Sequence, residues 1–93
     1  MKILIKKFGE ILISRSDGRE AYFAMSSSIL KNVSVDEEVE IDFLGVRVLT
    51  PGWADEVVTK IAERFKNVKL INTENSSVQA TLKTLREYSD LKI

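Results

Sequence analysis

The chemistry open to this chain is carried by carboxylates, amines and hydroxyls, because its 93 residues include no histidine and no cysteine. Histidine is the commonest general base and cysteine is a strong nucleophile, so the usual catalytic groups are missing. The acidic run Asp36-Glu37-Glu38 precedes an expected strand, and short charge runs of this kind are usually solvated turns. We therefore expect a protein that is not an enzyme and has no catalytic residues.

A second acidic pair, Asp55-Glu56, falls in the first turn of an expected helix, where negative charge is favourable. Adjacent helical residues point about 100° apart, so we do not expect these two carboxylates to act on one bond. The sequence contains neither a glycine-rich phosphate loop nor the acidic spacing of a calcium loop. We expect no metal and no cofactor.

One stretch could bind an anion. Arg15, Asp17, Gly18 and Arg19 surround an expected helix start, where free backbone N–H groups point outward. The two arginines would add positive charge there. The alternative is that this helix start contacts only water, and the sequence leaves both open.

The most unusual segment joins a strand end to a helix start at Thr50-Pro51-Gly52-Trp53. Thr50 or Gly52 can cap the helix, and Pro51 suits its first turn. Trp53, the only tryptophan, either folds onto the sheet or stands partly exposed as an anchor for a partner. Such junctions are where α/β proteins usually place their sites. The predicted partner-binding surface comprises Thr50, Pro51, Gly52, Trp53, Asp55 and Glu56.

Hydrophobic spacing predicts the elements that position these residues, in the order ββαβαβα and in one domain over residues 1–93. The strands are expected at 2–6, 11–14, 39–49 with a bend at Gly45, and 68–71, and the first two are expected to form a hairpin. The helices are expected at 19–31, from Thr50 to Asn67, and after Asn75-Ser76-Ser77. The apolar stripe of the second helix comprises Ala54, Val57, Val58, Ile61, Ala62 and Phe65.

Charged residues in the expected strands predict how the helices are arranged. Glu40, Asp42 and Lys69 alternate with apolar residues, whereas strands covered on both faces are apolar throughout. We therefore expect an α/β fold with a sheet of about four strands. Three helices should pack on one face, and the second face should be largely solvated.

The composition limits the classes of partner and the cellular compartment that we expect. Fourteen basic and fourteen acidic residues give zero net charge, which argues against nucleic-acid binding. The small basic group formed by Lys2, Lys6 and Lys7 is better explained as charges that prevent aggregation through an edge strand. No apolar run approaches the about 20 residues of a membrane span, and the first residues lack the apolar stretch of a signal peptide. We expect a cytoplasmic protein with neither a nucleic-acid nor a membrane partner.

Two motifs, Ile41-Asp42-Phe43-Leu44-Gly45-Val46 and Trp53-Ala54-Asp55-Glu56, resemble those of a known family. The first is similar to a D-F-x-G-V strand and the second to the turn into a helix in the STAS-like domain family of unknown function, the DUF4325 group. Ser14-Arg15 is similar to the S-R element of that family. The resemblance runs from about Lys2 to Leu85, and its most specific part is Trp53-Ala54-Asp55-Glu56.

The resemblance implies a fold and a functional class. STAS domains place helices on one side of a mixed sheet, and many are anti-sigma factor antagonists that bind a kinase-like partner. Phosphorylation of a serine at a helix start switches that binding. An ungapped match puts this serine at Gly52, which has no hydroxyl, and Thr50 lies two residues away. We therefore expect the interaction surface without the phosphoserine switch.

The leading hypothesis is a non-enzymatic protein-interaction and regulatory module. By resemblance, its partner is a histidine-kinase-like ATPase or another signalling protein. The alternative is a small-ligand or nucleotide-sensing domain in which Arg15 and Arg19 hold an anion. An open sheet face or an edge strand would also allow a homodimer.

Overall fold

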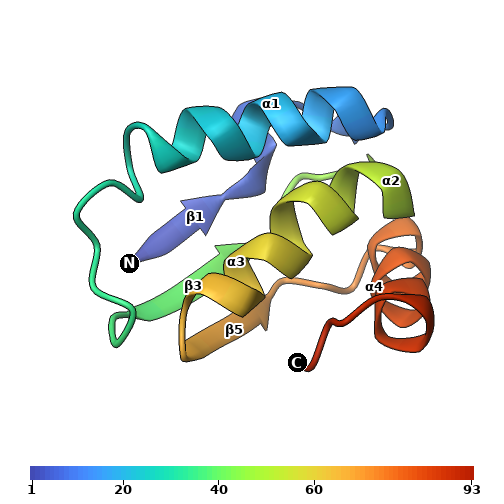
Figure 1. Ribbon diagram of the computed structural model, residues 1–93. Helices are drawn as coiled ribbons and strands as arrows, with labels where there is room; N and C mark the ends of the chain where they lie inside the picture. The colour runs from blue at the N-terminus through green and yellow to red at the C-terminus, as the bar shows by residue number, and fades with distance from the viewer.

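The computed structural model describes all 93 residues, which form three helices and two small sheets (Figure 1). The elements are β1 (Lys2–Leu4), the 3-10 turn η1 (Ile5–Phe8), β2 (Ile11–Leu12), α1 (Arg15–Ser26), β3 (Glu38–Asp42), β4 (Val48–Leu49), α2 (Pro51–Ala54), the π-helical segment η2 (Asp55–Thr59), α3 (Lys60–Arg64), β5 (Asn67–Ile71) and α4 (Ser76–Tyr88). Because α2, η2 and α3 follow one another without a break, Pro51–Arg64 form one helix.

Every strand pair is parallel. One sheet has the order β1-β3-β5 and the other pairs β2 with β4. The predicted hairpin and the predicted mixed sheet of about four strands are therefore wrong. The chain does not reverse after β1, because η1 and Gly9, with φ at 131°, carry it on to β2. Glycine adopts that backbone conformation readily, and the two early strands then pair with different later strands.

Helix α1 and the helix Pro51–Arg64 lie on one side of the three-stranded sheet, as predicted (Figure 1). The connections from β1 to β3 and from β3 to β5 advance in the same direction across a parallel sheet. Such crossovers are right-handed, so their helices must fall on the same face. The third helix, α4, differs from the expectation, because it packs against α2 and β4 rather than over this sheet.

The other face of this sheet carries a row of charges. In register, Lys2 lies beside Glu40, and Glu40 lies beside Lys69. Lys69 is exposed and forms an ion pair with Glu38 at 3.4 Å, while Glu40 is half-buried. These positions agree with a face that no helix covers. Asp42 is the exception, because it is only 5% exposed.

Asp42 is buried because it closes the turn after β3. Its Oδ1 accepts hydrogen bonds of 2.9 Å from the Leu44 N–H and from Asn72 Nδ2. The bond from Asn72, followed by that from Leu44, holds the pKa of Asp42 below its usual range, against the cost of burial. The carboxylate therefore joins the ends of β3 and β5.

We expect Asp42→Ala to lower the free energy of unfolding by about 2 kcal/mol, because two hydrogen bonds to a charged acceptor are lost. Urea unfolding of the two proteins measures this difference. Asp36→Ala is the matched control, because Asp36 is exposed and its only ion pair is with the exposed Lys66. An equal effect of both substitutions would contradict the role given to Asp42.

The helix Pro51–Arg64 supplies much of the core. The buried residues of its predicted stripe are Ala54, Val57, Val58, Ile61 and Phe65, and Ala62 is partly buried. They pack with Ile3, Val39 and Ile41 of the sheet in one cluster. The helix ends at Arg64 and not at Asn67, which begins β5. The helical period therefore predicted the buried face correctly, but not the last turn.

Helix α1 begins four residues earlier than predicted and ends five residues earlier. Ser14 caps it by accepting a hydrogen bond from the Asp17 N–H at 3.1 Å. Near its other end, the hydroxyls of Ser27 and Ser28 donate to the carbonyls of Phe23 and Ala24. The Phe23 carbonyl also accepts a hydrogen bond from the Ser27 N–H, so the serine hydroxyls add to the hydrogen bonding of the last turn. Helix α4 starts within the expected segment Asn75-Ser76-Ser77, where Asn75 caps it by accepting a hydrogen bond of 3.0 Å from the Val78 N–H.

None of the helices has both the length and the apolar character needed to cross a membrane.

Candidate functional site

The predicted partner segment lies where β4 passes into α2. Thr50 caps the helix, since its Oγ1 accepts a hydrogen bond of 3.5 Å from the Trp53 N–H, and its hydroxyl donates to the carbonyl of Ile13. Pro51 occupies the first helical position, where its missing N–H costs nothing. Thr50 therefore joins the chain after β2 to the start of α2. Pro51 is exposed and Gly52 is half-buried.

Trp53 is packed into the core. Its residue surface is 2% exposed, and its ring centroid lies 6.2 Å from that of Phe8. Of the two interpretations that the sequence left open for Trp53, the structure supports the packed one. Trp53 is therefore not an exposed anchor and instead supports the surface around the helix start from beneath.

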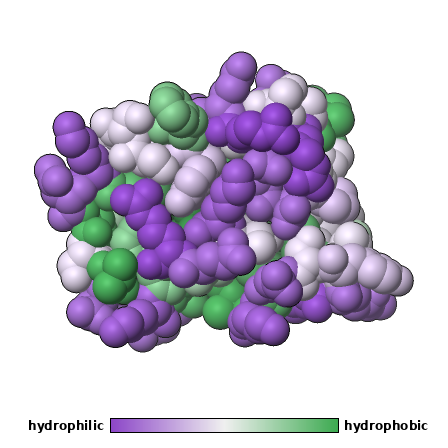
Figure 2. Space-filling view, viewed as in Figure 1, coloured by the Kyte–Doolittle hydropathy of each residue, from purple (hydrophilic) through white to green (hydrophobic).

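The predicted acidic pair belongs to a charged cluster in the seam between α1 and the helix Pro51–Arg64. Hydrophilic side chains gather over this part of the surface (Figure 2). Arg15 Nη1 donates hydrogen bonds to Glu56 Oε2 at 2.8 Å and to Asp55 Oδ2 at 3.0 Å. Lys60 Nζ donates to Glu56 Oε1 at 2.6 Å, and Arg19 Nε lies 3.6 Å from the same oxygen. The two carboxylates converge on one guanidinium, contrary to the expected divergence, because the long arginine side chain reaches both.

Both acids stay ionised although they are partly or largely buried. For Glu56, the hydrogen bonds from Lys60 and then Arg15 outweigh the cost of burial and lower its pKa to about 2. For Asp55, burial is the largest single influence and opposes ionisation. The hydrogen bond and charge of Arg15, together with the neighbouring Ser89 and Thr59 hydroxyls, outweigh it and hold the pKa below its usual range. The cluster therefore links α1 to the helix Pro51–Arg64 by ion pairs whose members are charged at neutral pH.

Gly18, one of the residues predicted to bind an anion, lies at the closest approach of the two helices. A β-carbon there would lie 2.6 Å from the Trp53 carbonyl oxygen and 3.2 Å from Glu56 Cβ. The glycine thus allows α1 to pack directly on α2 and η2. The other residues of that predicted site are distributed around this contact, with Arg15 and Arg19 already paired to carboxylates. An anion would have to compete with those carboxylates for the two arginines.

Asp55 and Glu56 lie in η2, a single π-helical stretch of five residues within the helix. Such π-helical turns are rare and occur frequently at functional sites. Sequence reasoning missed this segment, because an apolar stripe at helical spacing does not distinguish an α-helix from one with a π-helical turn. It adds a local irregularity to the part of the helix that holds the charged seam.

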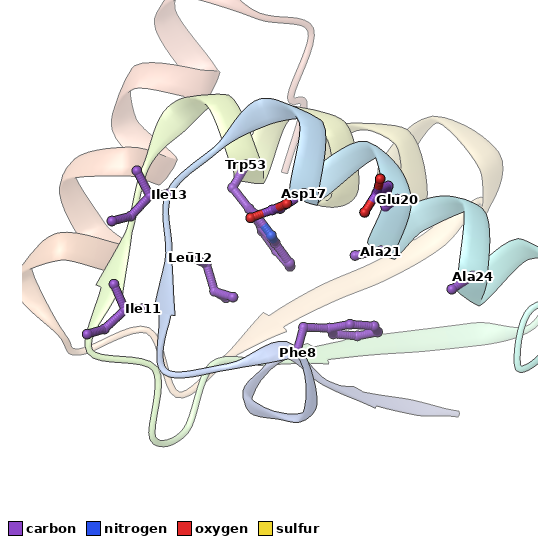
Figure 3. Close-up of a pocket in the computed structure, with 9 residues that line it drawn as sticks. All are labelled: Phe8, Ile11, Leu12, Ile13, Asp17, Glu20, Ala21, Ala24 and Trp53. Carbon is purple, nitrogen blue, oxygen red and sulfur yellow. The ribbon is translucent and has the colours of Figure 1, made fainter.

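An open cavity of about 340 Å³ lies between α1 and β2 (Figure 3). Leu12 and Trp53 point into it, Phe8 lies across from Trp53, and Ala21 and Ala24 of α1 form the opposite side. Sequence reasoning missed this cavity, because the cavity depends on how β2 and α1 are placed relative to one another in the folded protein.

The outer face of the sheet formed by β2 and β4 is apolar and exposed. Ile11, Ile13 and Val48 are 55%, 59% and 37% exposed, and Ile11 lies beside Val48 in register. Leu12 and Leu49, on the other face, are buried. The signal in the sequence is the run Ile11-Leu12-Ile13, whose apolar residues occupy both faces of a strand rather than alternate ones.

Together these features define a small α/β module with parallel strands, three helices and a charged seam beside a capped helix start. A family model described as a STAS-like domain of unknown function (DUF4325) matches residues 27–78, more than half of the chain, so the protein belongs to this family. The match includes both quoted motifs but neither Ser14-Arg15 nor the full span from Lys2 to Leu85. No curated protein and no solved structure shows a significant match.

Proposed function

We propose that this STAS-like domain is a non-enzymatic protein-interaction and regulatory module. The observation that supports this most directly is the exposed apolar face of Ile11, Ile13 and Val48. Contiguous exposed apolar surface is more typical of an interaction site than isolated exposed residues are. Burial of these side chains against a partner would remove them from water and favour association.

The proposed contact area, which we name the β2–α2 surface, joins this face to the predicted helix start. It comprises Ile11, Ile13, Val48, Thr50, Pro51 and Gly52. The hydroxyl of Thr50 contacts the carbonyl of Ile13, so the two parts are adjacent. Asp55 is half-exposed and adds a charge nearby, whereas Trp53 and Glu56 hold the surface in place from below.

The domain is proposed to work without a phosphoserine switch at the helix start. Gly52 carries no hydroxyl, and the Thr50 hydroxyl already caps α2 and donates to Ile13. Phosphorylation of Thr50 would therefore remove a cap rather than add to a free site. By analogy with STAS domains, the partner is a histidine-kinase-like ATPase or another signalling protein, an expectation that rests on fold alone.

The test compares binding by the wild type and by Ile13→Lys. We expect the substitution to weaken partner binding about tenfold or more, because it puts a charge in a buried apolar contact. Proteins retained from a cell extract are quantified by mass spectrometry, and the affinity of the purified partner is then measured by calorimetry.

Val35→Lys is the matched control, because Val35 is 47% exposed and lies outside the β2–α2 surface. Both variants should unfold at the temperature of the wild type, so that lost binding is not lost folding. Partner binding that survives Ile13→Lys unchanged would place the contact elsewhere on the domain. If no partner is retained by the wild type, the proposed function is contradicted.

A further inference from the structure

A groove runs along one side of α1. The cavity beside β2 is continued by a second one, of about 300 Å³, which lies between α1 and β1. Phe8 and Ala24 line both cavities. We name the two together the α1 groove.

The groove follows the free edges of two strands. β1 pairs only with β3, and β2 pairs only with β4, so each has one unpaired edge. Residues 1–4 line one cavity and 11–13 line the other, without alternation. Strand side chains alternate between faces, so a cavity lined by consecutive residues borders the edge of the strand.

The free hydrogen-bonding groups of β2 can be identified. The carbonyls of Glu10 and Leu12 accept hydrogen bonds from the Val48 and Thr50 N–H groups on the β4 side. Peptide groups alternate in direction along a strand, so the N–H and C=O of Ile11 point away from β4. In Figure 3 the Leu12 side chain enters the cavity, while those of Ile11 and Ile13 point away from it. An added strand beside β2 would place alternate side chains in these same two directions.

The two ends of the groove have opposite charge. Asp17 and Glu20 border the cavity beside β2, and Lys2 and Lys7 border the cavity beside β1. None of these four side chains forms an ion pair within the protein. They are therefore available to a partner, and their opposite signs would fix the direction in which it lies.

We propose that the α1 groove binds an extended apolar segment of the partner protein, which adds as a strand to the free edge of β2. Its basic end lies at Asp17 and Glu20, and its acidic end lies at Lys2 and Lys7. Main-chain hydrogen bonds supply affinity in strand addition, and the cavities select the side chains. This inference rests on the proposed function, because the added strand would contact Ile11 and Ile13 of the β2–α2 surface.

The test uses random linear peptides displayed on phage and selected on the wild-type domain. We expect the selected peptides to alternate apolar residues and to carry opposite charges at their ends. Ala24→Arg should weaken their binding about tenfold or more, because Ala24 is exposed and lines both cavities. Phe23→Arg is the matched control, since Phe23 is 74% exposed on the same helix and lines neither cavity.

Strand pairing is tested with N-methylated copies of a selected peptide. Methylation of alternate amides, those that face β2, should abolish binding, and methylation of the others should change it less than about twofold. The Ile11 amide should also exchange its hydrogen more slowly in the complex. Peptides with helical spacing, or binding that tolerates methylation at every position, would overturn strand addition.

The remaining outcomes separate this inference from the proposed function. Peptide binding that is unchanged by Ala24→Arg but lost on Ile13→Lys would contradict binding in the α1 groove. The same result would still support the β2–α2 surface as a contact area. Failure to select any peptide would also contradict peptide binding in the α1 groove. Capture of a partner whose binding is weakened by Ile13→Lys would still support the interaction module.

Discussion

Gly18→Ala is expected to lower the free energy of unfolding by about 2 kcal/mol, although alanine is normally the better helix former. The new methyl group would lie 2.6 Å from the carbonyl oxygen of Trp53 and 3.0 Å from its Cα. Both are backbone atoms, so they cannot rotate away as a side-chain tip could. Helix α1 would have to move off α2, which would also disturb the charged seam. Urea unfolding monitored by the fluorescence of Trp53 measures the change.

Gly52→Ala provides the matched control for this prediction. A β-carbon at position 52 would lie 3.6 Å from Arg15 Cβ, which is an ordinary contact. Its backbone is helical, so alanine should raise the free energy of unfolding by up to about 1 kcal/mol through the unfolded chain. If both substitutions stabilise the domain equally, the two helices are not in tight contact at Gly18.

Glu56→Gln is expected to destabilise the domain by about 3 kcal/mol near neutral pH. The amide keeps the shape of the side chain but removes the charge that Lys60, Arg15 and Arg19 share. Glu63→Gln is the control, because Glu63 is exposed on the same helix. Chemical unfolding at constant salt measures the difference between the two variants and the wild type.

The effect of Glu56→Gln should depend on pH. The pKa of Glu56 falls from 4.5 to about 2 in the folded protein, so its ionised form stabilises the fold. This contribution is complete above pH 4.5 and is lost as the pH falls toward 2. The unfolding free energies of the wild type and the variant should therefore converge near pH 2. A difference that stays constant over this range would show that Glu56 does not act through its charge.

The sequence predicted the features that depend on short spacing. The stripe from Ala54 to Phe65 has a helical period, and alternation identified β3 through Val39 and Ile41. The face bearing Glu40 and Lys69 was also predicted, because a charge in mid-strand is costly under a helix. Each of these follows from residues within a few positions of one another.

The features that were missed depend on residues far apart in the chain. Two short strands close in sequence normally suggest a hairpin. Here the paired residues of β1 and β3 are 38 positions apart, as in Lys2 and Glu40, and those of β2 and β4 are 37 apart, as in Ile11 and Val48. The seam was missed for the same reason, since Arg15 and Glu56 are brought together only by helix packing at Gly18. Trp53 was ambiguous because its burial depends on Phe8 and α1 rather than on its own helix.

The all-parallel pairing has a consequence for how this chain reaches its fold. No strand can pair with its neighbour in sequence, so every strand contact requires the closure of a long loop before it contributes any energy. Proteins dominated by such distant contacts fold more slowly than helical bundles of similar size. On a ribosome, β1 emerges well before β3, and its backbone stays unpaired until β3 has been made. Lys2 lies in β1 and Lys6 and Lys7 lie just after it, and charged side chains of this kind disfavour the pairing of an open strand with other chains.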